Sequence, residues 1–451
     1  MHRARWRAGG LLAAVGGLVL CGMAAGLAPG DGALLEVKAA VESKIEAELP
    51  NLVELYKHLH ANPELSFEEV KTAARMAAEL RQAGFEVTEK VGGHGVVAVL
   101  KNGAGPTLML RTDLDALPIV EDTGLPYASL VRVRDAEGKQ VGVMHACGHD
   151  IHMTCWVGTA RVLASLRDRW RGTLVMIAQP AEERGAGAKA MLEDGLFSRF
   201  PKPDFALALH CDGATPHGQI GYTEGLALAN VDSVDIVVKG VGGHGSAPHT
   251  TVDPIVIAAR IIVDLQTIVS REVDPLESAV VTVGSIHGGS KHNIIPAEVK
   301  LQLTVRTFKD SVRKHVLEAI ERIAKSAAAA ARAPEPVVAA IPGEFTPATY
   351  NDPKLTQRVV GVLKPVLGSE NVNTMLPRMG GEDFSRYGRA GVPIFMFWLG
   401  TVPPEKVAEA RQQGRPMPSL HSAFYAPVPE PSVRTGVLSL AMAALELLDK
   451  P

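Results

Sequence analysis

The chain has 451 residues, of which 46% are apolar and 21% are charged, with 44 glycines and 30 prolines. This length exceeds the needs of one ordinary hydrophobic core, so it predicts two domains, or one large domain with a smaller one inserted. The composition is that of a folded globular protein, and a formal net charge of −3 excludes a global basic field for nucleic acid. A small molecule or a peptide is therefore the expected partner.

The first 30 residues have the pattern of an export signal followed by a short linker. Three arginines lie within residues 1–7, an apolar run covers residues 9–20, and small residues surround residues 22–24. The pattern predicts a cleaved signal and a periplasmic or secreted protein. The alternatives are a retained N-terminal anchor and lipidation at Cys21, which is disfavoured because Leu20 stands where a small residue is expected. Apart from this possible anchor, we expect no membrane partner.

Removal of the signal leaves an odd number of cysteines: Cys147, Cys155 and Cys211. Even in an oxidising compartment, at least one thiol then stays outside an internal disulfide. Cys147 lies in the stretch VMHACGHDIHMT, residues 143–154, together with three histidines and an aspartate. This stretch is therefore either half of a disulfide or part of a metal site.

Strand-like and helix-like segments alternate through the first half of the chain. Short apolar runs, several bounded by glycine, predict buried strands, and helical patterns lie between them. The predicted strands cover residues 95–100, 107–110, 174–178 and 205–209, and the predicted helices cover residues 51–84 (two, around a turn at 62–65), 156–166 and 188–192. The alternation predicts an α/β layer architecture.

Between residues 229 and 342 the pattern changes to a β-α-β-β-α order. This order is typical of a compact, ferredoxin-like α+β unit with its own sheet, and strands of the first type resume after it at residues 393–398. The smaller unit therefore reads as an insertion into the larger domain. The expected boundaries are 1–30 for the signal and linker, 45–228 and 343–451 for the two parts of the larger domain, and 229–342 for the insertion.

Polar residues stand where the predicted strands end. Because ligands of open α/β sheets bind beyond the carboxyl ends of strands, we expect four polar groups to converge on one crevice. These groups are residues 111–118, 145–150, 179–183 and 210–211. His421, near the C-terminus, is a further candidate to return to this crevice.

Each group alone has an ordinary explanation, since an isolated histidine is more often structural and an adjacent glutamate pair is usually solvated. Glu182 and Glu183, however, directly follow a buried strand and a proline, where two carboxylates repel unless a cation lies between them. His149 shares a cation with the thiolate of Cys147 if the chain turns at Gly148. Thiolate, imidazole and carboxylate together form a ligand set for zinc or another divalent transition metal.

Eight motifs occur in an order and at separations that are very unlikely to be coincidence. They are HANPEL (60–65), RTDLDALP (111–118), HACGHD (145–150), QPAEE (179–183), GGHGSAP (242–248), NIIP (293–296), GGEDF (380–384) and HS (421–422). With them, residues 52–448 resemble the di-metal amidohydrolase and peptidase family that includes aminoacylase-like enzymes, carboxypeptidase G and succinyl-diaminopimelate desuccinylase. The resemblance is strongest to the branch of hippurate hydrolases, N-acyl-amino-acid amidohydrolases and auxin-conjugate hydrolases.

The resemblance implies a zinc-peptidase-like catalytic domain, with a mixed sheet flanked by helices, interrupted by an α+β lid that forms a homodimer. It implies that Cys147 bridges two divalent metal ions, whose coordination His149, Glu183, His210 and His421 complete. Zn, Mn, Co and Ni all suit these ligands. Related branches have an aspartate in the bridging position, so the cysteine identifies this branch.

The resemblance also implies roles around the metals. Glu182 would be the general base for a metal-activated water, and His244 would polarise the scissile carbonyl, either in its own subunit or across a dimer interface. Asn293 and Arg306 would hold the substrate's free carboxylate, and Asp113 would support a metal ligand from behind. The alternative readings are a turn asparagine, a solvated strand arginine and an aspartate that caps a turn.

The expected function is hydrolysis of the amide bond of N-acyl-amino acids such as hippurate. One alternative is a metallo-dipeptidase or carboxypeptidase acting on short peptides, and another is a metal-retaining binding protein without turnover. The departures from the family pattern are Cys211, Cys155–Trp156 and Ser290–His292, which change the expected shape of the substrate pockets. The added Lys291 cation favours an acidic group on the substrate.

Overall fold

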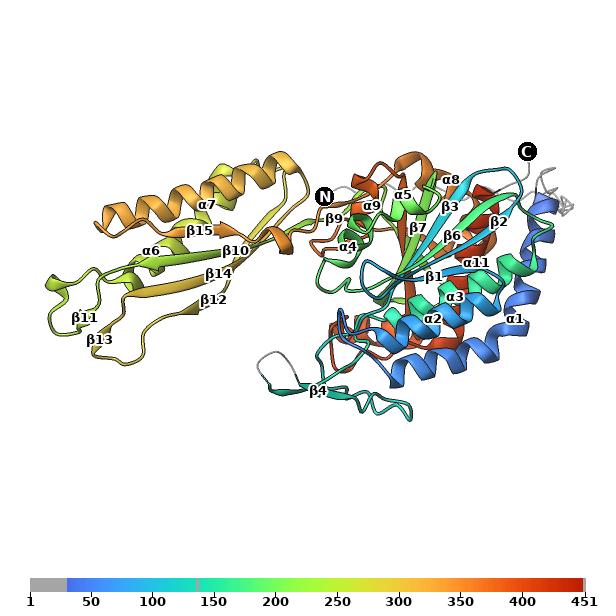
Figure 1. Ribbon diagram of the computed structural model, residues 1–451, viewed down its shortest axis with the longest axis horizontal. Coiled ribbons are helices and arrows are strands. Elements are labelled where there is room, and N and C mark those ends of the chain that lie inside the picture. The colour runs from blue at the N-terminus through green and yellow to red at the C-terminus, as the bar shows by residue number, and fades with distance from the viewer. Residues whose placement is uncertain (1–30, 135–137, 449–451) are drawn as a thin grey trace, which may run out of the picture.

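The structure, a computed structural model, describes residues 31–134 and 138–448 (Figure 1). The predicted export signal, Cys21 included, lies outside the described residues. Among the helices of the described part, none is both long and apolar enough to cross a membrane. Figure 1 shows a larger body and, beside it, an elongated smaller unit built from the middle of the chain.

The larger body is built on an eight-stranded mixed sheet. Its strands are β1 (Glu86–Val91), β2 (Gly95–Asn102), β3 (Thr107–Asp113), β6 (Gly172–Gln179), β7 (Phe205–Pro216), β8 (Ile220–Tyr222), β17 (Val372–Thr374) and β18 (Ile394–Val402), in the order β1-β2-β6-β3-β7-β18-β8-β17. The central strands β6, β3, β7 and β18 are parallel, whereas β2 and β8 run antiparallel to β6 and β18. The carboxyl ends of the four parallel strands therefore meet at one edge of the sheet.

Helices cover both faces of this sheet. In β3, Leu108 and Leu110 belong to one apolar core and Met109 to another, so alternate residues face opposite layers. The first core packs against α1 (Asp31–Ala61), α2 (Val70–Gln82), α3 (His149–Ser165), α8 (Pro353–Leu367) and α11 (Pro429–Leu447), and the second against α4 (Gly187–Glu193), α5 (Leu196–Arg199) and α9 (Ser385–Arg389). Burial on both faces explains why these strands read as continuous apolar runs. A further helix, α10 (Pro404–Gln413), follows β18.

The smaller unit has its own sheet and its own core. Its elements are β10 (Asn230–Lys239), α6 (Pro254–Thr267), β12 (Ala279–His287), β14 (Glu298–Thr307), α7 (Asp310–Ala330) and β15 (Val337–Ala340). The sheet order β12-β14-β10-β15 is antiparallel throughout, which with the β-α-β-β-α-β sequence gives a ferredoxin-like fold. Alternate residues of β10 and β14 are buried under α6 and α7.

The two bodies are joined where the chain leaves and re-enters the larger one. Val231 and Thr346 form an antiparallel bridge, and the side-chain oxygen of Asn230 accepts the backbone N–H of Ala348 at 2.8 Å. Short ladders lie on the larger-body side of the junction, at the far tip of the smaller unit, and in a projecting hairpin (Figure 1). The ladder beside the junction pairs β9 (Gly225–Leu228) with β16 (Thr349–Asn351). The ladder at the tip pairs β11 (Gly243–His244) with β13 (Ile294–Ile295), and the projecting hairpin pairs β4 (Arg132–Arg134) with β5 (Gln140–Gly142).

Three element boundaries differ from the sequence prediction by seven residues or more. The first helix begins at Asp31, before residue 51, and α3 begins at His149, before residue 156. β7 does not end before His210 but continues to Pro216, because its parallel ladder with β18 extends past Trp398. His210 is thus held inside a strand and is less free to move than a loop residue would be.

Candidate metal centre and active site

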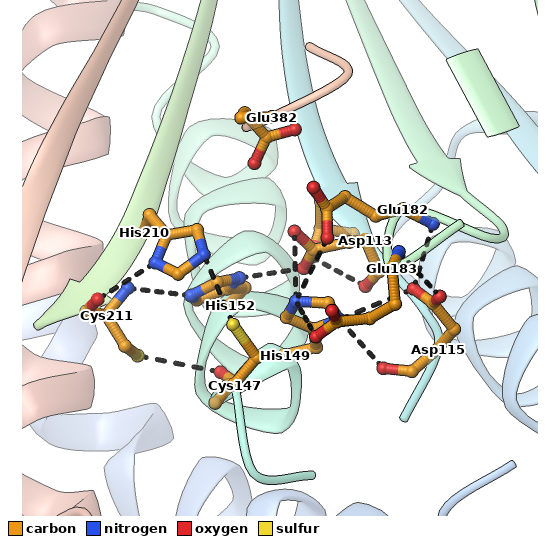
Figure 2. A network of polar contacts seen from close by, with 12 residues as sticks. Asp113, Asp115, Cys147, His149, His152, Glu182, Glu183, His210, Cys211 and Glu382 are labelled. Atoms are coloured by element: carbon orange, nitrogen blue, oxygen red, sulfur yellow. Dashed lines mark hydrogen bonds and ion pairs between the residues drawn. The ribbon is translucent and has the colours of Figure 1, made fainter. Parts of the chain in front are cut away.

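Polar side chains from four separate segments meet at the carboxyl edge of the large sheet (Figure 2). Asp113 ends β3, Glu182 and Glu183 follow β6, His210 lies in β7, and His149 begins α3. A cavity of about 670 Å³ opens here, and its lining includes six of the predicted site residues: Cys147, Glu182, Glu183, His210, Arg306 and His421. The four groups expected to converge therefore do so.

Cys147 reaches this cavity because the chain turns sharply at Gly148. The turn has φ +82°, and an added Cβ would lie 2.8 Å from the Sγ atom of Cys211, so both conformation and space require glycine. The Sγ atom of Cys147 lies 3.5 Å from His210 Nε2 and 3.3 Å from His421 Nε2. Cys147 is a free thiol, as are the other two described cysteines, Cys155 and Cys211.

Two histidines hold their Nε2 atoms toward the cluster. His149 donates from Nδ1 to the backbone carbonyl of Asp115 at 2.7 Å, and His210 donates from Nδ1 to the carbonyl of Cys211 at 2.9 Å. Such a bond fixes the ring orientation and leaves the Nε2 lone pair for a metal. The Nε2 atom of His149 is buried without a hydrogen-bond partner among the described residues.

Glu183 and His421 close the cluster from the other side. Glu183 Oε1, also buried without a hydrogen-bond partner in the described chain, lies 3.5 Å from His421 Nε2 and 3.8 Å from His149 Nε2. His421 has a left-handed backbone with φ +63°, and its N–H donates to the carbonyl of Ala146 at 2.9 Å. A non-glycine residue in this conformation is common at functional sites, and here it ties the C-terminal loop to the Cys147 turn.

The pKa shifts within the cluster indicate that its buried acidic groups lack enough positive charge to balance them. Burial, with the charge of neighbouring carboxylates, raises the pKa of the Cys147 thiol and of the Glu182 carboxyl, and burial raises the pKa of Glu183 to about 7. For His149, burial opposes the charged form, but Asp113 and further acidic neighbours raise its pKa to about 10. The residues alone would thus take up protons, a demand that a divalent cation among them removes.

The ligand atoms form two groups that share one sulfur atom. Cys147, His149 and His210 form one group, and Cys147, Glu183 and His421 form the other; within each, the ligand atoms lie within 4.8 Å of one another. Sulfur, imidazole nitrogen and carboxylate oxygen are ligands of zinc and related divalent metals. The residues therefore fit two divalent metal ions, which the two ligand groups would hold with the Cys147 thiolate in common.

Asp113 lies next to the ligand His149, outside the two ligand groups. It accepts hydrogen bonds from His152 Nδ1 and Arg111 Nη1, both at 2.7 Å, and its Oδ2 atom lies 3.7 Å from His149 Nε2. His152, in turn, accepts the backbone N–H of Cys211 at 2.8 Å on Nε2, so both of its nitrogens are occupied. His152 was not among the predicted site residues, although its spacing of three residues from His149 places both on one helix face.

Asp115 orients the glutamate pair and was also missed. Its two carboxylate oxygens accept the backbone N–H groups of Glu182 at 3.1 Å and Glu183 at 3.0 Å, and Ser66 Oγ donates to it at 2.6 Å. The Asp-x-Asp spacing at the end of β3 was the available signal. Asp115 thus aligns both carboxylates through their own backbone.

A buried network of ion pairs and hydrogen bonds holds the two acidic residues of the GGEDF motif. Arg111 Nη2 donates to Glu382 at 2.8 Å and to Asp383 at 3.1 Å, and Gln179 donates to Asp383 at 2.6 Å. All four side chains are almost fully buried. The network fastens residues 380–384 to the ends of β3 and β6, directly beside Glu182.

The residues predicted in the smaller unit divide into two sets. Arg306, in β14, lines the cavity, where its Nε donates to Thr304 at 2.9 Å and no described carboxylate pairs with it. His244 and Asn293 instead lie together at the far tip, where the N–H of Gly245 donates to the Asn293 carbonyl at 2.8 Å (Figure 1). The structure therefore brings Arg306 to the metal cluster of its own chain, but not His244 or Asn293.

Comparison with known proteins agrees with this geometry. Residues 109–413 match the model of peptidase family M20/M25/M40, and the chain belongs to this family of amide-bond hydrolases. It is 40% identical over 328 residues to hippurate hydrolase of Campylobacter jejuni, covering 72% of this chain and 82% of that one. It is 35% identical over 403 residues to thermostable carboxypeptidase 2 of Saccharolobus solfataricus, covering 88% and 96%.

A solved structure supports the fold and the binding of two metal ions. The YXEP protein of Bacillus subtilis, described as a dinuclear metal binding peptidase of the M20 family, superimposes with a TM-score of 0.71 at 31% identity. The match covers 89% of this chain and 99% of that one. The predicted family and the predicted fold class are thereby confirmed.

Proposed function

We propose that the protein hydrolyses the amide bond of N-acyl-amino acids in a site that holds two divalent metal ions. The observation that carries this proposal is the pair of ligand groups sharing Cys147, with Glu182 beside them. The ligands are Cys147, His149, Glu183, His210 and His421. The similarity to hippurate hydrolase supports a substrate with an acylated amino group.

The metal ions, when bound, supply Lewis acidity for the attacking water and the scissile carbonyl. Glu182 serves as general base: its Oε2 atom lies 3.8 Å from His149 Nε2, while its backbone is held by Asp115. Its buried carboxyl, next to the ligand Glu183 and outside the two ligand groups that share Cys147, suits a group that takes a proton from water and delivers it to the leaving nitrogen. Any of Zn, Mn, Co and Ni suits the ligands.

The smaller unit contributes to substrate binding in this proposal. Arg306 faces the cavity without a carboxylate partner in the described chain, as a group that binds the substrate's free carboxylate would. His244 and Asn293 are exposed at the tip of the smaller unit. We propose that the protein is a homodimer in which these two residues complete the cavity of a second copy, with His244 polarising the scissile carbonyl.

The main alternative keeps the chemistry and changes the substrate. The similarity to a thermostable carboxypeptidase favours cleavage of short peptides as the second candidate function. A binding protein without turnover is the third, and the retention of Glu182 argues against it because metal binding alone does not require that carboxylate. The two enzymatic candidates differ in whether the amino group of the substrate must be acylated.

The test uses the chain from residue 31 onward, stripped of metal and reloaded with Zn, Mn, Co or Ni. N-acetyl- and N-benzoyl-amino acids are compared with unblocked dipeptides, and Glu182→Gln is the control, with metal content measured for both proteins. Metal-dependent release of amino acid from blocked substrates, lowered about 10²–10⁴-fold in the variant at equal metal content, is the expected result. Cleavage confined to dipeptides would establish the peptidase alternative, and bound metal without turnover would establish the binding protein.

We also propose that the protein is exported through residues 1–30. The basic start, apolar run and small residues of that segment support this. N-terminal sequencing of the protein recovered from cell fractions tests it. A start near residue 25 in the exported fraction is expected, and an intact N-terminus in the membrane fraction would indicate an anchor.

A further inference from the structure

A second arginine, Arg378, lines the same cavity as Cys147 and His210. It lies between β17 and the GGEDF motif, and its side chain is 36% exposed. Neither the metal cluster nor the buried network around Glu382 uses it. Its position in the cavity lining therefore needs its own explanation.

Arg378 is held rigidly in place. Its Nη2 lies 2.6 Å from the Oδ2 atom of Asp212, and its guanidinium carbon lies 4.4 Å from the ring centre of Trp398. Asp212 is itself 4% exposed and accepts hydrogen bonds from the backbone of Ala214 and the hydroxyl of Thr215, each at 3.0 Å. The ion pair and the stack together fix the guanidinium before any ligand arrives.

Some N–H groups of the Arg378 guanidinium have no acceptor among the described residues. Of its five N–H groups, only those on Nη2 have partners among the described residues: Asp212, and the sulfur of Met375 at 3.9 Å. The Nε and Nη1 donors have no described acceptor, and each can form a charge-assisted hydrogen bond to a carboxylate oxygen. The Trp398 ring lies 5.2 Å from the ring of His210, so Arg378 stands one aromatic ring away from the metal cluster.

Three arginines line the cavity: Arg184 is an exposed residue next to Glu183, whereas Arg306 and Arg378 come from different units. Arg306 belongs to the smaller unit, and its Nη1 lies 3.5 Å from the carbonyl of Met379. Arg378 belongs to the larger body and stacks on β18 through Trp398. If the substrate carried one carboxylate and Arg306 bound it, the Nε and Nη1 donors of Arg378 would still have no acceptor among the described residues.

We propose that Arg378 is a specificity-determining residue that binds a second carboxylate of the substrate. The inference rests on the proposed function and narrows it: the preferred substrates are N-acyl-amino acids with two carboxylates. Arg306 binds the carboxylate of the amino-acid backbone, and Arg378 binds the other. That second carboxylate belongs either to the side chain of the amino acid or to the acyl group.

The experiment compares acids with their neutral, nearly isosteric amides on the metal-loaded protein. N-benzoyl-glutamate with N-benzoyl-glutamine places the second charge on the amino acid, and N-succinyl-alanine with N-succinamyl-alanine places it on the acyl group. kcat/KM is measured for wild type and for Arg378→Gln. The matched control is Arg199→Gln, since Arg199 also pairs with an aspartate, Asp194, and stacks on a ring, Phe200, but does not line the cavity.

We expect wild type to prefer the acid in one of the two pairs at least about tenfold in kcat/KM, and Arg378→Gln to remove that preference. The pair that shows the effect identifies the carbon chain that carries the second carboxylate. Arg199→Gln keeps the wild-type ratio. Hydrolysis without an acid preference, or a preference that Arg378→Gln leaves intact, overturns the inference alone, whereas no hydrolysis of any of the four substrates overturns the proposed function with it.

Discussion

The Oε1 atom of Glu69 accepts the backbone N–H of Ala181 at 2.8 Å, so a buried carboxylate at the start of α2 holds the residue before the general base. Ala181 has φ +49°, a conformation that a non-glycine residue keeps only when its surroundings enforce it. Asp115 holds the next two N–H groups, those of Glu182 and Glu183. The loop that presents both glutamates is thus fixed by two acidic side chains.

Glu69→Ala is therefore expected to lower kcat by about tenfold or more, because the loop loses its anchor and Glu182 moves relative to the substrate. Glu69→Gln should keep most of kcat, since its amide oxygen still accepts from Ala181. Steady-state kinetics at saturating metal measure both, and Glu68→Ala, on the exposed neighbour, is the control. A wild-type kcat in Glu69→Ala would show that the loop keeps its shape without this bond.

Metal binding should raise thermal stability. The cluster gathers Glu182, Glu183 and the Cys147 thiol in a buried space, and a ligand that binds only the folded state stabilises it. We expect Tm to fall when the metal is chelated and to recover on adding Zn. Cys147→Ser should abolish most of this difference, because it removes the sulfur atom common to both ligand groups.

Cys155→Ala is the matched control for that measurement. Cys155 is fully buried in the core, so its removal lowers Tm in both states, but the difference between loaded and chelated protein should persist. Loss of the metal-dependent difference in Cys155→Ala would mean that the ligand geometry depends on core packing rather than on the cysteine sulfur.

His60 should make stability fall at alkaline pH. Burial opposes its charged form, but hydrogen bonds from Nδ1 to Asp150 at 2.6 Å and from Nε2 to Glu121 at 3.0 Å raise its pKa to about 9, against its usual 6.5. A raised folded-state pKa gives stability that is complete below about pH 6.5 and is lost as pH rises through about 9, at most about 3 kcal/mol. Urea unfolding of wild type and His60→Gln across this range tests the slope.

The exposed neighbour His58 provides the control, since no described carboxylate pairs with it. His58→Gln should keep the wild-type loss of stability between pH 6.5 and 9, whereas His60→Gln should be less stable at pH 6 and show a smaller loss. Parallel curves for wild type and His60→Gln would contradict a charged His60 in the folded state.

Two bidentate ion pairs near the junction should differ in strength. Arg389 and Asp310 are 50% and 57% exposed, so Arg389→Ala should cost less than about 1 kcal/mol. Arg313 pairs with Asp232, which is 3% exposed, so Arg313→Ala leaves a buried carboxylate alone and should cost about 3 kcal/mol. Equal free energies of unfolding in the two variants would show that solvent reaches Asp232.

The sequence predicted the parts of this structure that local pattern controls. The buried strands β3, β6 and β7 appear as apolar runs because both of their faces are covered, and the turn at Gly148 follows from the need to bring Cys147 toward a shared cation. The β-α-β-β-α order expected between residues 229 and 342 matches β10, α6, β12, β14 and α7 of the smaller unit. Strand-end position then sufficed to group His149, Glu183 and His210.

What the sequence could not reveal depends on contacts between distant segments. Asp115 looks like a turn residue until β6 places the N–H groups of Glu182 and Glu183 against it. Arg378 carries no local signal either, since its role depends on Trp398 and Asp212, which reach it through the pairing of β18 with β7. The end of β7 was predicted too early, before His210, because its parallel ladder with β18 determines where the strand ends, and local composition does not.

The bridge between Val231 and Thr346 holds the two ends of the smaller unit next to each other. The chain leaves the larger body and returns to it through neighbouring antiparallel segments, and the unit encloses an apolar core separate from those of the larger body. Excision of residues 232–345 would leave two ends that are already adjacent. We therefore expect that the unit can be exchanged between relatives as one block, which would transfer Arg306, His244 and Asn293 together and leave the metal ligands in the larger body.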